Sequence, residues 1–413
     1  MANTDYDYIS PGKTGAHLVT FESGLSSAQQ LNLLQDISGS SVRSLSIMDE
    51  SGMGQLGRDT PVLFDGLDVG YVPILNKNKN YAISDSRNFD GIIKPLSDTP
   101  DGIIAIEEET YIYAIEAPEN NFYSDLPTHT WGLEAIGFPG SNYTGLGIKV
   151  AILDTGFDMN HPDFSGRSII AKNFSSSSST NDVNGHGTHC TGTAVGYGRT
   201  TSSGTFVRYG VANKAEIYIG KVLGDNGYGS AADAIDAIRW AVQQGCDIVS
   251  MSLGSAVKRG QPHSAAYEAV AAAALKAGTL VIAAAGNDSR RSQGVIRPVG
   301  SPANCPSIMA VGGVDSRLAM YDRSCGDVNG LPGSAIDIAA PGVNIFSSYS
   351  APRLYARLTG TSMACPHVAG VAALLAEKYP SQRGQDLWNI LVNTATPLTH
   401  PKTDVGSGLV RIP

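Results

Sequence analysis

Beyond residue 147, continuous apolar runs alternate with segments of helical spacing, and this alternation constrains the fold more than any other feature. The strand-like runs are IKVAILDTG (148–156), AEIYIGKVL (215–223), CDIVSMSLG (246–254) and TLVIAAAGN (279–287), with helical patterns at 231–245 and 265–278. Strands this continuous in apolar residues are buried on both faces, so the pattern predicts an α/β fold with a mainly parallel sheet covered by helices. Binding residues collect at the carboxyl ends of such strands, where Asp154, Ser252 and Asn287 stand.

Residues 1–118 have a different pattern and predict a separate, small α+β unit. AHLVTF (16–21) alternates like a strand. A helical segment follows, with Gln30 three residues after Ser27, which is the spacing of a capping box. Further strand-like runs come next, and the last of them is GIIAIEEETYIYAI (102–115).

At 413 residues the chain is long enough for two domains, and a polar, proline-bearing segment marks the boundary between them. We expect residues 119–130 to form an exposed linker that a protease can cut, and residues 131–413 to form the second domain.

The acidic and basic side chains are distributed unequally between the same two parts of the chain. Residues 1–120 carry 18 acidic and 7 basic side chains, and the remainder carries 20 and 22. The acidic unit is either a solvated domain or a detachable partner, and neither reading favours nucleic acid as a ligand.

Two further patterns concern location and redox chemistry. No apolar run reaches the roughly 18 residues of a membrane span, and the start, MANTDYDYIS, lacks the regions of a signal peptide. We expect a cytoplasmic protein if the chain is complete, or a secreted one if a signal was removed. Five cysteines with no C-x-x-C spacing indicate neither a disulfide scaffold nor a zinc ribbon. A bridge between Cys305 and Cys325 depends on a distance that the sequence does not give.

Three residues of chemical interest each have a plain structural explanation when taken alone. Asp154 ends a strand and suits a turn, His186 lies among glycines in NGHGTHC (184–190), and Ser362 begins a helical stretch, where serine is a common cap. A metal site at His186 and His189 is disfavoured, because the Glu of H-E-x-x-H is missing, and His189 is predicted to be structural. Together, a carboxylate, a histidine and a serine in this order match one known order of catalytic triads.

Four stretches then carry a family resemblance. DTGFDMNHPDF, NGHGTHCTGT, AAAGN and GTSMACPHVAG resemble the signature blocks of the subtilisin-like serine proteases, the subtilases. DVNGHGTHC and KVLGDNGYGS are most similar to the proteinase K branch, and the likeness runs from about residue 126 to 413. The resemblance implies a three-layer subtilisin-like fold and a serine endopeptidase that works through an acyl-enzyme. Ser362 would be the nucleophile, His186 its base, and Asp154 the group that orients the histidine.

The same resemblance implies the rest of the site. The side-chain amide of Asn287 and the backbone N–H of Ser362 would bind the oxyanion. Residues that would line the substrate cleft are Gly227, Gly229, Ser252, Leu253, Gly254, Ala284 and Gly300. Gly300 matches the base of the first specificity pocket, so we expect broad specificity with large apolar or aromatic P1 residues. By the same likeness, the Ser301–Pro302 peptide bond is expected to be cis.

The N-terminal unit resembles, less specifically, the inhibitory pro-regions of the family, although its middle, about 50–100, matches poorly. We expect it to act as chaperone and inhibitor and to be removed by self-cleavage between about 110 and 126. Polypeptides are the expected substrates of a monomeric enzyme that needs no cofactor for its chemistry. The resemblance also allows structural calcium, since Asp163 in HPDF matches a calcium ligand of subtilisins, but the loop that completes that site is missing after TGTAVG.

Three other readings stay open at this stage. A subtilase of the peptide-tailoring kind transfers its acyl group to an amine in place of water, and it would share the triad. A silent scaffold would keep the N-terminal unit bound permanently. A cysteine hydrolase would use Cys365, but that residue lies three positions beyond Ser362 and would face another side of the helix.

Overall fold

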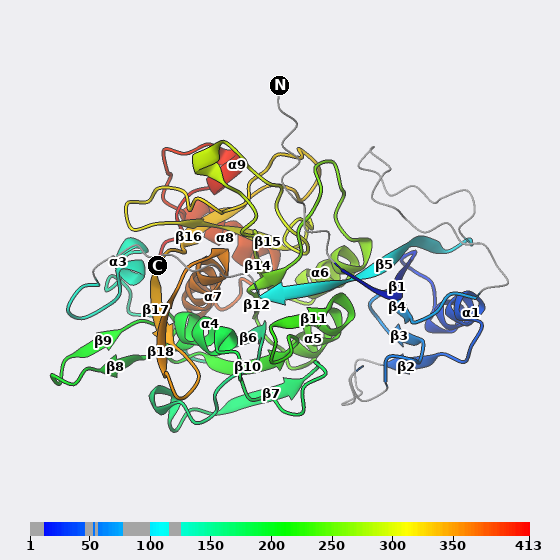
Figure 1. The fold of residues 1–413 in the computed structure, drawn as a ribbon, viewed down its shortest axis with the longest axis horizontal. Helices are drawn as coiled ribbons and strands as arrows, with labels where there is room; N and C mark the ends of the chain where they lie inside the picture. The colour runs from blue at the N-terminus through cyan, green and yellow to red at the C-terminus, as the bar shows by residue number, and fades with distance from the viewer. Residues whose placement is uncertain (1–11, 46–52, 54–56, 77–99, 115–124) are drawn as a thin grey trace.

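The computed structural model describes residues 12–45, 53, 57–76, 100–114 and 125–413 (Figure 1). Its larger part is built on seven strands, in the spatial order β16 (Ile338–Pro341), β15 (Met309–Val314), β14 (Leu280–Ala284), β12 (Ile248–Met251), β6 (Lys149–Asp154), β10 (Glu216–Lys221) and β7 (Ile169–Asn173). Every neighbouring pair in this sheet is parallel. The predicted parallel α/β sheet is confirmed.

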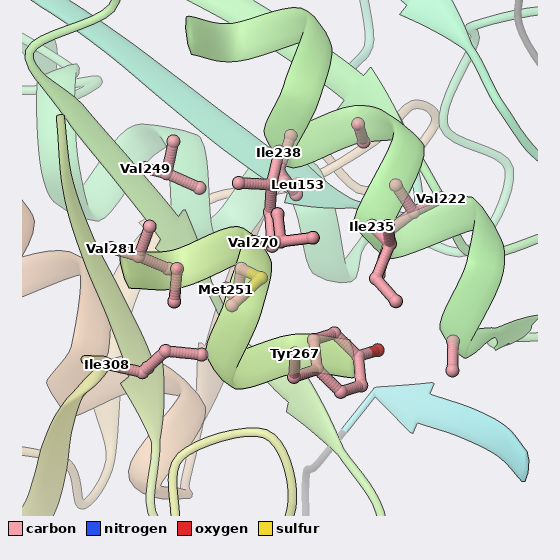
Figure 2. Close-up of a cluster of buried hydrophobic side chains, with 14 of the residues drawn as sticks. Leu153, Val222, Ile235, Ile238, Val249, Met251, Tyr267, Val270, Val281 and Ile308 are labelled. Carbon is pink, nitrogen blue, oxygen red and sulfur yellow. The ribbon is translucent and has the colours of Figure 1, made fainter. Parts of the chain in front are cut away.

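Helices cover both faces of this sheet, as predicted. One face packs against α4 (His186–Val195), α7 (Thr361–Lys378) and α8 (Gln385–Thr394), and the other against α5 (Ala231–Gln243) and α6 (Ala265–Lys276). Alternate residues of a strand enter different cores because successive side chains point to opposite faces. On β6, Ile152 packs with α7, whereas Leu153 packs with α5 and α6 (Figure 2).

Shorter elements lie around the sheet. They are α3 (Trp131–Ala135), η1 (Pro162–Phe164), β11 (Tyr228–Ser230), β13 (Leu253–Gly254), η2 (Arg291–Gln293), α9 (Lys402–Val405) and the antiparallel pairs β8 (Gly198–Thr200) with β9 (Phe206–Arg208) and β17 (Ile345–Ser348) with β18 (Tyr355–Leu358). No helix among the described residues has the length and apolar character needed to cross a membrane.

The N-terminal unit has its own small sheet and helix. Its strands lie in the order β5 (Ile103–Ala114), β1 (Lys13–Phe21), β4 (Val69–Val72), β3 (Val62–Phe64) and β2 (Arg43–Leu45), and all pairs but β2–β3 are antiparallel. Helix α1 (Ser27–Ser38) packs Leu34 and Ile37 onto this sheet. The opposite face shares a core with α5 and α6 of the larger part. The predicted α+β character of this unit is therefore present.

The capping box of α1 lies one residue earlier than predicted. Ser26 has extended backbone angles and is the N-cap, and its N–H donates to Oε1 of Gln29 at 2.9 Å. Gln30 is buried instead, and its amide donates to Asp68 at 2.6 Å. The prediction of Ser27 with Gln30 was wrong because two consecutive serines offer the same spacing, and only the burial of Gln30 decides between them.

All five cysteines are free and buried, so the suggested bridge between Cys305 and Cys325 is wrong. The two thiols have different surroundings. The Cys305 thiol points to the carbonyl of Ser264, and the Cys325 thiol to the carboxylate of Asp288. Burial raises the pKa of Cys325 to about 12. A buried, protonated thiol of this kind packs as a small apolar group.

Candidate active site

Asp154 and His186 meet at the carboxyl edge of the parallel sheet. Asp154 is the last residue of β6, in the middle of the sheet, and His186 is the first residue of α4. Nδ1 of His186 lies 2.8 Å from Oδ1 of Asp154, and the N–H of Thr155 donates to the same oxygen at 2.7 Å. Both side chains are buried. The carboxylate therefore holds Nδ1–H and leaves Nε2 to face the other side of the ring.

The position of His186 depends on the glycine before it. Gly185 is the N-cap of α4 with φ +99°, a backbone conformation that residues with a Cβ rarely adopt. A Cβ at Gly185 would also lie 2.2 Å from the ring of Tyr349, whose hydroxyl donates to the carbonyl of Asn184 at 2.7 Å. The glycine in NGHG thus allows both the turn into the helix and the close packing of an aromatic ring beneath it.

The charge on His186 follows from its pairing. Burial by itself would lower the pKa of His186, but the charge and hydrogen bond of Asp154 outweigh burial and raise this pKa well above its ordinary value. His189 has no such partner, and burial lowers its pKa to about 3. Its Nε2 bonds to the carbonyl of Ile345 at 2.9 Å, which agrees with the predicted structural role.

Ser362 lies at the N-terminal end of α7, as predicted. It is the second residue of the helix and is buried, and its hydroxyl donates to the carbonyl of Ser252 at 3.1 Å. The hydroxyl of Ser252 donates in return to the carbonyl of Ser362 at 2.7 Å. Nε2 of His186 has no hydrogen-bond partner among the described residues. Since hydrogen bonds at catalytic sites are often unformed without substrate, rotation of the Ser362 hydroxyl would be needed to reach the histidine.

Two thiols lie near this site, and neither fits a catalytic or metal-binding role. Asp154, His186 and Cys190 have ligand atoms within 4.8 Å of one another. Nδ1 of His186 and Oδ1 of Asp154, however, are already bonded to each other at 2.8 Å, and burial raises the pKa of the Cys190 thiol to about 11. Cys365 points into the sheet, toward the carbonyls of Met251 and Ile282, and burial raises its pKa to about 12. The structure therefore gives no support to a cysteine hydrolase.

Asn287 is held beside Ser362 by Thr361, the residue that precedes the serine. Its Oδ1 accepts bonds from both the N–H and the hydroxyl of Thr361, each at 3.0 Å. Because the oxygen end of the amide is used in this way, the Nδ2 end is the one left to donate elsewhere. The N-terminus of α7 adds the positive end of the helix dipole beside Ser362. The arrangement can stabilise negative charge on a group bound at Ser362.

The predicted substrate-binding edges are both occupied by β5 of the N-terminal unit. β5 pairs antiparallel with β11, where Ile112 lies opposite Gly229, and with β13, where Ala114 lies opposite Leu253 and Tyr113 opposite Gly254. Figure 1 shows this long strand running from the small sheet into the larger part of the molecule.

The turn before β11 takes part in the same pairing. The N–H of Ala114 donates to the carbonyl of Gly227 at 3.1 Å, and Ser252, whose carbonyl holds the Ser362 hydroxyl, precedes the paired Leu253. The structure thus brings together Gly227, Gly229, Ser252, Leu253 and Gly254 along one extended segment.

Ala284 and Gly300 lie next to this segment. Ala284 ends β14 and is buried, and Gly300 donates to the carbonyl of Ala285 at 2.9 Å. A Cβ at Gly300 would lie 2.8 Å from the carbonyl oxygen of Ser255, so a side chain there would displace the backbone. The following peptide bond, Ser301–Pro302, is cis, as the family likeness implied.

Asp163, the predicted calcium ligand, is bonded to protein groups, and its role in calcium binding stays a prediction. Its two carboxylate oxygens accept bonds from the hydroxyls of Tyr209 at 2.6 Å and Tyr355 at 2.9 Å. Calcium needs six to eight oxygen ligands, and the described residues place no cluster of ligating side chains around Asp163. The segment after TGTAVG forms the β8–β9 hairpin, and its Arg199 guanidinium lies 5.0 Å from the Tyr355 ring centre. Phenols and an arginine thus surround the carboxylate.

Comparison with known proteins agrees with this geometry. A sequence model of the Subtilase family matches residues 145–409. The chain belongs to the subtilase family. M-protease of Shouchella clausii (strain KSM-K16) is 37% identical over 350 residues, which cover 82% of this chain and 83% of that protein. Subtilisin Savinase of Lederbergia lenta is 39% identical over 68% of this chain and 96% of its own length, and subtilisin E of Bacillus subtilis (strain 168) is 34% identical over 78% and 77%.

The predictions of a subtilase and of a serine endopeptidase are therefore confirmed. A subtilase needs no cofactor for its chemistry. The closer likeness to the proteinase K branch and the domain boundaries stay predictions. The first half of the predicted linker, residues 119–124, lies outside the described residues.

Sequence reasoning missed two residues of this subtilase. Tyr228 lies between the two predicted glycines of β11 and touches the bound strand through its ring. Arg58 bridges the N-terminal unit to α5. An aromatic residue between glycines at a substrate edge was a readable signal for Tyr228. A single arginine in a stretch without a motif gave no signal for Arg58.

Proposed function

We propose that this subtilase is made as a self-processing zymogen whose active enzyme cuts polypeptides through Ser362, His186 and Asp154. The observation that carries the assignment is the buried 2.8 Å pairing of Asp154 with His186 next to a serine at the N-terminus of α7. In this assignment, His186 takes the proton of Ser362 as the hydroxyl oxygen attacks the substrate carbonyl. It then gives the proton to the departing amine, which breaks the peptide bond and leaves an acyl-enzyme.

The second half of the reaction uses the same groups. Water replaces the amine, and His186 takes a proton from it as its oxygen attacks the acyl carbon. His186 then returns that proton to the oxygen of Ser362 as the ester bond breaks, which releases the acid and restores the serine. Asp154 keeps the imidazole oriented and stabilises its charged form, in keeping with the raised pKa of His186. The oxyanion of each tetrahedral intermediate would accept bonds from the Nδ2 amide of Asn287 and the backbone N–H of Ser362.

The cleft proposed for substrate is the one that β5 fills. Gly227, Gly229, Leu253 and Gly254 would pair with the backbone of a substrate, as they pair with β5. Backbone pairing selects weakly among sequences, which supports broad specificity. Ala284 and the bare Gly300 would leave room in the first pocket for large apolar or aromatic P1 side chains.

We infer that residues 1–118 form an inhibitory pro-domain, residues 119–130 a linker with the processing site, and residues 131–413 the catalytic domain. Support comes from β5, which enters the cleft from the N-terminal unit and carries the anchoring carboxylate of Glu107. Glu107 accepts bonds from the Ser264 hydroxyl and the Ala266 N–H at the start of α6, both at 3.1 Å. Such bonds stabilise a helix N-terminus, so the unit suits a folding chaperone as well as an inhibitor.

The register of β5 also narrows the expected cut. Ala114, the last described residue of β5, pairs with Leu253, and Leu253 directly follows Ser252, whose carbonyl accepts the hydrogen bond of the Ser362 hydroxyl. We therefore expect self-cleavage at the first peptide bonds after Ala114, inside the broader range of about 110 to 126.

Intact mass after reaction with a fluorophosphonate probe tests the proposal, with wild type and Ser362→Ala side by side. The expected result is a labelled, shortened wild-type chain and an unlabelled, full-length variant. Labelling of the variant would refute the role of Ser362. Product masses from a peptide offered together with an excess of a second amine separate hydrolysis from acyl transfer. A wild type that is never labelled, even after the linker is cut by an added protease, would favour the silent scaffold.

A further inference from the structure

Tyr228 projects from the middle of the cleft edge that β5 occupies. It is flanked by Gly227, which has φ +81°, and by Gly229, where a Cβ would lie 2.2 Å from the carbonyl oxygen of Val222. Neither neighbour can carry a side chain without strain or a clash. Tyr228 therefore supplies the one side chain that this three-residue edge presents to a bound strand.

The bound strand presents an aromatic side chain to it. Tyr113 lies directly opposite Tyr228 in the antiparallel register, and the two ring centres are 6.2 Å apart with their planes tilted by 52°. This spacing lies in the range of attractive aromatic pairs. Ile112, the preceding residue of β5, is buried, as expected from the alternation of a strand. Tyr113 thus lies on the opposite face of β5 from Ile112, where it is half-buried against the core that contains α7 and meets the Tyr228 ring.

The backbone of Tyr228 is held by hydrogen bonds that do not involve β5. Its N–H donates to the side chain of Asn226 at 3.1 Å, and its carbonyl accepts from the N–H of Gly224 at 2.8 Å. Its side chain is still 57% exposed with β5 in the cleft. A ring that is fixed at its base and open to solvent can offer its face to any strand that takes the place of β5.

We infer that Tyr228 is a specificity-determining residue that favours an aromatic side chain at the substrate position taken here by Tyr113. This inference rests on the proposed function, since it treats β5 as a stand-in for substrate. Cross-strand aromatic contact would add to backbone pairing, which is indifferent to side chains. The substrate class is thereby narrowed from any extended polypeptide to extended segments with Tyr, Phe or Trp at that position.

The test uses two p-nitroanilide peptides that copy residues 112–115, Ile-Tyr-Ala-Ile and Ile-Ala-Ala-Ile, with the processed enzyme. We expect kcat/KM of the wild type to favour the tyrosine peptide by about two- to tenfold, the usual strength of an aromatic pair. Tyr228→Phe, the matched control, keeps the ring and should keep the preference. Tyr228→Ala should bring the ratio of the two kcat/KM values close to one.

A second peptide pair controls for general damage to the cleft. Replacing the first Ile with Val should have the same effect in wild type and in Tyr228→Ala, because Ile112 faces the core. A preference that survives in Tyr228→Ala, or that is missing from the wild type, would overturn the inference while leaving the protease assignment intact. Absence of fluorophosphonate labelling at Ser362 would instead mean that the proposed function has failed, and the inference with it.

Discussion

Arg58 should determine how tightly the N-terminal unit binds the catalytic domain, and its replacement by glutamine tests this directly. The guanidinium contacts the carboxylate of Asp233 on α5, donates to the Ser230 hydroxyl at 2.8 Å, and lies 3.8 Å from the carboxylate of Glu109 on β5. The side chains of Asp233 and Glu109 are 4% and 0% exposed. Without Arg58, the buried carboxyl groups of Asp233 and Glu109 would face each other across the interface, and one of them would have to take up a proton or keep an uncompensated charge.

The size of the effect follows from burial. Removing one partner of a buried ion pair costs about 3–5 kcal/mol, since the other charge is left uncompensated. The Arg58 side chain is 41% exposed, so water screens part of its charge, and about 1–3 kcal/mol is a fairer range. That range corresponds to roughly 5- to 100-fold weaker binding. We therefore expect Arg58→Gln to release the N-terminal unit faster by about this factor.

The assay follows the full-length chain in time. Intact mass reports cleavage, and the rate of fluorophosphonate labelling reports how fast Ser362 becomes accessible. Lys13→Gln is the matched control, because Lys13 pairs with Glu108 inside the N-terminal unit, with side-chain exposures of 55% and 38%. Removal of that exposed pair should change labelling little.

A compensating variant keeps the reasoning refutable even if Arg58→Gln folds poorly. Asp233→Asn removes one of the two opposed carboxyl groups, so the double variant Arg58→Gln/Asp233→Asn should label at a rate close to that of the wild type. Equal labelling rates in Arg58→Gln and Lys13→Gln would refute the charge argument. Faster cleavage without faster labelling would place the effect at the processing site instead of the interface.

Three further predictions concern other parts of the molecule. Asn287→Ala should lower kcat by about 10²–10³ with little change in KM, as loss of an oxyanion donor does; a loss below tenfold in steady-state kinetics would contradict the role. Burial raises the pKa of Asp233 to about 7 in the bound state, and this carboxyl returns toward about 3.9 once released. Binding of the N-terminal unit should therefore weaken as pH rises from about 4 to about 7, so the labelling rate of wild type relative to Asp233→Asn should rise over that window; a flat ratio would contradict this. Finally, the shift in melting temperature caused by a calcium chelator should be the same in wild type and Asp163→Asn, and its disappearance in the variant would show that Asp163 is a calcium ligand.

The parallel sheet, the contact of Asp154 with His186 and the place of Ser362 at a helix start were predictable because their signals are local. These signals are the four apolar residues before Asp154, the glycines around His186 and the helical run after Ser362. Each of them determines the conformation of the backbone next to it. Their meeting point follows from one general property of parallel sheets, in which strand ends lie at one edge. The position of the capping box was not predictable, since Ser26 and Ser27 offer equal spacing and tertiary burial of Gln30 decided between them.

Most contacts between distant segments could not be predicted from the sequence. The pairing of β5 with β11 and β13 joins residues more than 100 positions apart, and no local pattern encodes such a register. The two phenols on Asp163 come from residues 46 and 192 positions away. Family likeness suggested an ion there because it transfers a single ligand, whereas the chemistry of a site depends on every group around it.

Helix α7 ties the nucleophile to the interior of the protein. Every residue from Thr361 to Ala376 is buried, between the parallel sheet on one side and α4 on the other (Figure 1). A helix so enclosed cannot fray or unfold by itself, because its exposure would dismantle one of the two cores beside the sheet. Heat should therefore leave the reactive serine intact until the whole catalytic domain melts, and inactivation and cooperative unfolding should be one event.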